Sequence, residues 1–140
     1  MDNISAKTRS AIMSRVRSRH TSPELAVRKM LHADGFRYRL HCAALPGKPD
    51  LVFSKAKVAL FVHGCFWHLH ERCANARMPK SRIDYWRPKL RGNRRRDRLA
   101  QRKLEALGWT VVVVWECELA EPETVRRRLA RRLRTRSGAR

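Results

Sequence analysis

Residues 63–73 concentrate side chains that bind metal ions and transfer protons. Their sequence is HGCFWHLHERC, with three histidines, two cysteines and two adjacent aromatic residues. Zinc prefers thiolate and imidazole ligands, and histidine accepts or donates protons near neutral pH. The segment therefore supports two kinds of chemistry, metal binding and acid–base catalysis.

The cysteines predict one structural zinc site. Four residues separate Cys65 from His70, and two separate His70 from Cys73. Cys117 follows one apolar run as Cys65 follows another, so the two cysteines meet if those runs are neighbouring strands. Three thiolates and one imidazole would form a closed tetrahedral zinc site, with Cys42 left as a buried free thiol. The alternative is that Cys65 and Cys117 are small buried residues and His70 is a surface histidine.

The second kind of chemistry is cleavage of a phosphodiester, which needs an activated water and neutralised phosphate charge. Asp50 follows the rigid turn 45–49, and we expect it to bind magnesium together with the backbone carbonyl of Val62. His63 and His68 are candidates for the general base or acid, and Glu24 is a candidate orienting group. Each carboxylate also has a simpler explanation, in which Asp50 caps a turn and Glu24 caps a helix without any role in catalysis.

Aromatic residues in the same region predict a wedge that enters DNA. Phe66 and Trp67 lie beside the catalytic candidates, and Trp86 lies in a basic stretch further along the chain. Large rings in loops can insert between base steps, and unstacking a base is least costly at a mismatch. Core packing beside the zinc site is the alternative for at least one of the three rings.

The charge of the chain indicates a polyanionic partner. The 140 residues include 33 Lys and Arg but only 12 Asp and Glu, a formal net charge of +21. DNA and RNA are the usual partners of such proteins, through release of counterions, and ribosome association is a less specific alternative. No apolar run approaches the roughly 20 residues that cross a bilayer, and no export signal or lipidation motif is present. We therefore expect a reducing cytoplasm and no membrane partner.

The pattern of apolar residues predicts an α/β sandwich around a mixed sheet. Residues 1–20 are predicted to be a basic arm, and residues 21–140 one domain. The predicted strands cover residues 36–40, 50–53, 58–62 and 109–115. The predicted helices cover residues 21–34, 81–85, 93–107 and the arginine-rich stretch 121–135.

Motifs between residues 5 and 120 resemble, in order and in spacing, those of the very short patch repair endonuclease family. They are LPGKPD at 45–50, HGCFWH at 63–68, DYW at 84–86, Asn93, RD at 96–97, LGW at 107–109 and VWEC at 114–117. The resemblance implies a restriction-endonuclease-like mixed β-sheet flanked by helices, with a structural zinc site. It also implies an enzyme that nicks DNA on the 5′ side of the mispaired thymine in a T·G mismatch left by deamination of 5-methylcytosine.

The resemblance assigns a role to each catalytic candidate. Asp50 resembles the magnesium-binding aspartate, and Val62 stands where the family presents a threonine whose carbonyl meets the metal. His68 resembles the histidine that activates the water, and His63 its companion. Glu24 resembles a glutamate of the N-terminal helix near the reaction centre.

The resemblance also assigns the binding residues. The implied zinc ligands are Cys65, His70, Cys73 and Cys117, and the implied DNA contacts are Phe66, Trp67, Trp86, Met13, Lys89 and Asn93. In addition to Val62 in place of the threonine, two features depart from the family pattern. Two residues separate His70 from Cys73, where the family has one, and Pro88 lies shortly after Trp86.

The implied partner is double-stranded DNA with a T·G mismatch, bound by a monomer in the bacterial cytoplasm and on the nucleoid during repair, with other mismatch-repair proteins as possible contacts. The alternative function is a zinc-stabilised, basic nucleic-acid-binding protein without catalysis. Asp50, His63 and His68 distinguish the two, because a protein that only binds has no need of them.

Overall fold

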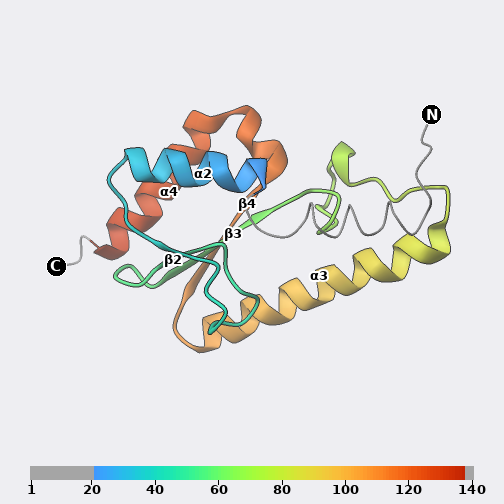
Figure 1. Ribbon diagram of the computed structural model, residues 1–140, viewed down its shortest axis with the longest axis horizontal. Coiled ribbons are helices and arrows are strands. Elements are labelled where there is room, and N and C mark those ends of the chain that lie inside the picture. The colour runs from blue at the N-terminus through green and yellow to red at the C-terminus, as the bar shows by residue number, and fades with distance from the viewer. Residues whose placement is uncertain (1–20, 138–140) are drawn as a thin grey trace.

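The computed structural model describes residues 21–137, and their side chains up to residue 134 (Figure 1). The predicted arm 1–20, with Met13, lies outside the described residues. The described elements, in chain order, are α2 (Ser22–Ala33), β1 (Arg39–Leu40), β2 (Leu51–Phe53), β3 (Val58–His63), η1 (Ala74–Ala76), α3 (Ile83–Ala106), β4 (Thr110–Trp115), η2 (Glu116–Ala120) and α4 (Pro122–Ser137).

The four strands form one mixed sheet in the order β1-β2-β3-β4. β2 pairs antiparallel with both β1 and β3, whereas β3 and β4 are parallel. Parallel neighbours need a long crossover connection, and α3 supplies it. The predicted mixed sheet flanked by helices is confirmed.

β3 is central because it is apolar on both faces, as the sequence predicts. Val58, Leu60 and Val62 face one core, and the alternate residues Ala59 and Phe61 face the other. This alternation follows from the two-residue period of a strand. Both faces of β3 must therefore be covered by helices.

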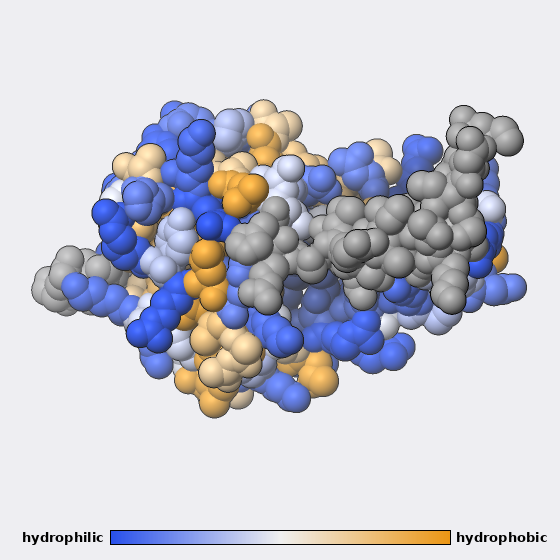
Figure 2. All heavy atoms as spheres, viewed as in Figure 1, coloured by the Kyte–Doolittle hydropathy of each residue, from blue (hydrophilic) through white to orange (hydrophobic). Residues whose placement is uncertain are grey.

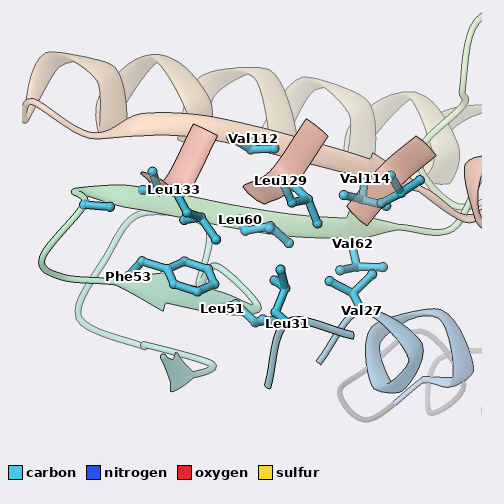
Figure 3. Packing of buried hydrophobic residues seen from close by; sticks show 13 residues of the cluster. Val27, Leu31, Leu51, Phe53, Leu60, Val62, Val112, Val114, Leu129 and Leu133 are labelled. Carbon is cyan, nitrogen blue, oxygen red and sulfur yellow. The ribbon is translucent and has the colours of Figure 1, made fainter. Parts of the chain in front are cut away.

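Two layers of helix cover the sheet (Figure 1). α2 and α4 lie on one face, where α4 inserts Val125, Leu129 and Leu133 at the four-residue spacing expected from the sequence. Figure 3 shows Leu60 between Leu129 of α4 and Leu31 of α2. α3 covers the other face. Outside these contacts, hydrophilic residues dominate the coloured part of the surface in Figure 2.

α2 begins and ends where the sequence predicts. The Thr21 side chain caps it by accepting a hydrogen bond from the backbone N–H of Glu24, and Pro23 lies in the first turn. Gly35 follows the helix with φ +88°, a conformation that suits glycine and ends the helix.

The prediction of two separate helices at 81–85 and 93–107 is wrong, because α3 joins the two segments. One continuous helix of 24 residues includes Pro88. Pro88 lies in the second turn, so its missing N–H removes a single intrahelical hydrogen bond near the helix start, and the long remainder maintains the helix. Figure 1 shows that α3 extends beyond the sheet, with its first half beside the loop that follows β3.

The outer strands are shorter or less buried than predicted. β1 has only two residues, and before it the Phe36 N–H bonds the Leu31 carbonyl at the end of α2 instead of a neighbouring strand. β4 begins after Trp109, and only its alternate residues Val112 and Val114 are buried.

The last helix covers 122–137, not 121–135. Among the described residues, no helix combines the length and apolar character required to cross a bilayer.

Replacing Leu60 with alanine should lower the free energy of unfolding by about 2–5 kcal/mol, measured by urea denaturation, because it leaves a cavity in the core. Leu60 is 0% exposed and pairs with Leu51 and Val112 on the neighbouring strands. The matched control is Leu25→Ala on α2, where the side chain is 45% exposed, and its change should stay within about 0.5 kcal/mol. Similar losses in the two variants would contradict the central position of Leu60.

Candidate active site and metal centre

A cleft of about 870 Å³ opens where β3 ends, and all four predicted catalytic residues line it. The N-terminus of α2, the segment before β2, the end of β3 and the middle of α3 all contribute to its wall. The titratable side chains that line it are Glu24, His41, Lys48, Asp50, His63, His68, Asp97 and Glu116. Residues far apart in the sequence therefore converge on one space.

A tight turn delivers Asp50 to this cleft. Gly47 has φ +75°, and a Cβ at this position would lie 2.7 Å from the Cβ of Ala100 and 3.2 Å from the Phe61 ring. Only glycine permits this close approach of the turn to α3 and β3. The rigid turn predicted from LPGKPD is thus fixed against the far layer of the fold, and Asp50 stands at its end.

The Asp50 carboxylate is held by the neighbouring strand. Its Oδ2 accepts a hydrogen bond of 2.7 Å from the backbone N–H of Val62. Burial raises the pKa of Asp50 to about 6, although the Val62 hydrogen bond acts in the opposite direction, and the negative charge of Glu24 raises it further. The site thus holds negative charge that is poorly solvated, which fits a hard cation with oxygen ligands.

Glu24 does more than complement the positive end of a helix. It is 1% exposed, and its Oε2 lies 2.7 Å from Nε2 of His41 and 3.5 Å from an Arg28 nitrogen. Ligand atoms of Glu24, His41 and Asp50 lie within 4.8 Å of one another. No sequence motif points to His41, which lies in an irregular segment after β1.

The two histidines that the sequence suggests as general base or acid are stacked. The rings of His63 and His68 are 3.8 Å apart and 4° from parallel. Nδ1 of His68 lies 2.5 Å from Oδ2 of Asp97, which comes from α3. Asp97 belongs to the RD motif, but the sequence analysis assigns it no role. Asp97 is 29 residues from His68, so no local pattern predicts their contact.

His63 departs from the near-neutral titration expected of a histidine. Burial, followed by the neighbouring His68, lowers the pKa of His63 to about 3. Its Nδ1 is buried and has no hydrogen-bond partner among the described residues. His63 is therefore neutral at physiological pH, and its contact with His68 is one of packing.

The predicted zinc ligands come together in a second cluster beside the cleft. Ligand atoms of Cys65, His70, Cys73 and Cys117 all lie within 4.8 Å of one another, and Cys117 Sγ is 3.5 Å from His70 Nδ1. The parallel pairing of β3 and β4 makes Cys65 and Cys117 meet, as the sequence predicts. The donor set of three sulfurs and one nitrogen suits zinc.

The loop after β3 accommodates the extra residue between His70 and Cys73 by local turns of the backbone. Arg72, between His70 and Cys73, has φ +56°, and Leu69 before His70 has φ +48°. These left-handed turns let His70 join the cluster despite the longer spacing. Cys42 lies outside the cluster, as predicted, but it is half-buried and not buried.

The three aromatic candidates contact one another. Phe66 lies 5.2 Å from Trp67 and 5.4 Å from Trp86 between ring centroids, in both cases edge to face. Trp86 is buried, which agrees with the core-packing alternative for that ring, whereas Phe66 and Trp67 are half-buried. Asn93 is buried as well and donates a 3.2 Å hydrogen bond to the Trp67 carbonyl.

Of the two other predicted DNA contacts, only Lys89 is described. Its Nζ lies 5.8 Å from the centre of the Tyr85 ring on the first half of α3, beside the aromatic group. Met13 is outside the described residues.

Comparisons with known proteins agree with this arrangement. The family model described as DNA mismatch endonuclease Vsr matches residues 1–75. A type II nicking enzyme of Xanthomonas oryzae, V.XorIIP, is 50% identical over 128 residues, which are 91% of this chain and 93% of that protein. The DNA mismatch endonuclease Vsr of Escherichia coli is 39% identical over 112 residues, 80% of this chain and 71% of that protein.

A solved structure supports the fold. The catalytic domain of the homing endonuclease I-Bth0305I matches with a TM-score of 0.57 and 18% identity, over 83% of this chain and 97% of that chain. The restriction-endonuclease-like fold expected from the sequence is therefore confirmed. The family model and the two enzymes above show that the chain belongs to the DNA mismatch endonuclease Vsr family.

Proposed function

We propose that this protein nicks one DNA strand on the 5′ side of the mispaired thymine in a T·G mismatch, by magnesium-dependent hydrolysis of the phosphodiester. Its family makes it a DNA endonuclease. The observation that carries the finer proposal is the convergence of Asp50, Glu24 and the His68–Asp97 pair on one cleft, beside a group of aromatic rings. T·G mismatches of this kind arise by deamination of 5-methylcytosine.

The carboxylates of the cleft would hold the cation. Asp50 is the principal ligand in this proposal, with the Val62 carbonyl as a second oxygen and Glu24 in the outer shell. When bound, magnesium neutralises phosphate charge and lowers the pKa of a coordinated water. The Val62 N–H fixes the Asp50 carboxylate in advance, so little reorganisation is needed when DNA arrives.

His68 is the general base of the proposed reaction. Asp97 engages Nδ1 of His68, which orients the ring and leaves Nε2 as the nitrogen that takes a proton. The attacking water gives its proton to His68 while its oxygen bonds to phosphorus. The bond from phosphorus to the 3′ oxygen breaks, and the products are a 5′-phosphate and, once the 3′ oxygen gains a proton, a 3′-hydroxyl. Neutral His63 supports the His68 ring by stacking.

Zinc is the proposed ion of the cysteine cluster, where its role is structural. The cluster offers four protein ligands, a number that closes the tetrahedral shell and leaves no position for a substrate. It would fix the irregular loop that carries both His68 and the aromatic group.

The aromatic group is the proposed mismatch reader. Phe66 and Trp67 would insert between base steps at the mismatch, where unstacking costs least. Asn93 holds the Trp67 backbone and thereby positions the wedge. All these residues come from one chain, so a monomer can carry the complete site. A protein that only binds DNA would have no use for the His68–Asp97 pair.

Asp50→Asn should lower the nicking rate of a T·G duplex in magnesium by at least about a hundredfold, because a catalytic metal contributes several kcal/mol to transition-state stabilisation. DNA affinity measured without magnesium should change by less than about threefold, because Asp50 makes no favourable contact with phosphate in the absence of a cation. Single-turnover nicking and fluorescence anisotropy measure the two. Asp84→Asn, an exposed aspartate at the start of α3, is the matched control. Persistent nicking by Asp50→Asn would remove Asp50 from the mechanism.

Elemental analysis of the purified protein should find about one zinc ion per chain, and Cys73→Ser should reduce this to less than about half, because the site loses one of four ligands. Cys42→Ser is the control, since Cys42 lies outside the cluster. The proposal fails if the wild-type protein holds no zinc, or if the two variants retain it equally.

Trp67→Ala should weaken discrimination between T·G and matched duplexes by about tenfold, because stacking on one base contributes roughly 1–3 kcal/mol. The ratio of nicking rates on the two duplexes measures this. Trp109→Ala replaces a partly buried tryptophan at the other end of the sheet and should leave the ratio unchanged. Equal losses on both duplexes in Trp67→Ala would assign Trp67 to packing alone.

A further inference from the structure

We propose that His41 is a positioning residue of the active site, which fixes Glu24 and Asp50 relative to each other. This inference rests on the proposed function, since it concerns the geometry of the two carboxylates that the reaction uses. Neither the sequence motifs nor the family resemblance pointed to His41.

His41 contacts both acidic residues through different atoms. Its ring Nε2 lies 2.7 Å from Oε2 of Glu24, on the first turn of α2. Its backbone N–H donates a 3.0 Å hydrogen bond to the carbonyl of Asp50. α2 and the segment before β2 are therefore joined at the edge of the cleft by this one residue.

The backbone of His41 shows that its position is specifically maintained. φ is +47°, in the left-handed region that a bulky side chain rarely adopts. Such a conformation persists only where surrounding contacts determine it. The two hydrogen bonds of His41 are contacts of this kind, and both end on residues of the candidate site.

Glu24 needs such a partner because it is almost completely buried. A buried carboxylate without good hydrogen bonds is strongly destabilised, and it would turn toward water or neutralise. Arg28 also approaches Oε2, but its distance of 3.5 Å is long for a hydrogen bond. The imidazole N–H of His41 is the closer donor, and it keeps the Glu24 carboxylate beside Asp50.

A pair of variants tests this role. Glutamine places its amide nitrogen near the position of a histidine Nε2, so His41→Gln keeps the contact with Glu24. Asparagine tolerates the left-handed backbone but is one carbon too short to reach Glu24. His41→Asn should therefore lower the single-turnover nicking rate by about 10–100-fold, the range typical of groups that orient active-site ligands. DNA affinity should stay within about threefold in both variants, because His41 acts on the carboxylates and not on DNA.

His41→Gln should recover the rate to within about threefold of wild type, because it restores the donor. His32→Gln, an exposed histidine at the other end of α2, is the control for loss of an imidazole. Melting temperatures of all variants separate a local effect from unfolding. Equal rates in His41→Asn and wild type, or equal losses in His41→Asn and His41→Gln, would overturn the inference.

A double-mutant cycle asks whether His41 acts through Glu24. In the Glu24→Gln background, His41→Asn should lower the nicking rate by less than a further factor of about two, because Glu24→Gln has already altered the contact that His41→Asn removes. Full additivity of the two losses would overturn the route through Glu24. A wild-type protein that does not nick T·G DNA would refute the proposed function itself, an outcome distinct from all of these.

Discussion

The parallel pairing of β3 with β4 is the constraint on which the rest of the structure depends. Its register places Val62 opposite Val114 and His63 opposite Trp115. Both strands therefore end at the same edge of the sheet, and the chain leaves each of them toward the same space. β3 ends at His63 and leads into Cys65 and His68, and β4 leads into Cys117. A slip of one residue would turn the side chains of β3 to the opposite core and separate the two cysteines.

The same pairing links the cluster of Cys65, His70, Cys73 and Cys117 to the cleft through Trp115. Its ring stacks on His70 at 4.0 Å between ring centroids and meets the His63 ring in an edge-to-face contact at 5.2 Å. The backbone N–H of Trp115 is held by Glu118, which Arg128 of α4 contacts in turn. The long crossover α3 closes the site from the other side with Asp97. The loop, the sheet and the helices thus position the His63–His68 pair together, and no single element could do so alone.

Local patterns predicted the elements that one stretch of chain determines. The apolar run of β3, the cap of α2 and the leucine spacing of α4 are properties of consecutive residues, and the structure confirms them. Pro88 misled the prediction of α3, because a proline in the second turn removes one hydrogen bond near the helix start and does not end a long helix. Asp97 and His41 were missed because their partners are 29 and 17 residues away. Spacing within a motif carries no information about such contacts.

The distribution of charge supports the proposed cation at this site. The chain carries 33 basic residues and 12 acidic ones, so its overall field attracts DNA. Among the described residues that line the cleft, however, four are acidic and Lys48 is the only lysine or arginine. Charges within a few ångströms outweigh more distant ones, because salt screens fields over about 8 Å. A phosphate drawn in by the whole protein therefore meets local repulsion from Glu24, Asp50 and Asp97. The proposed divalent cation, which Asp50 would hold with Glu24 nearby, would offset that repulsion, and the burial of Asp50 would strengthen the attraction between its carboxylate and the ion.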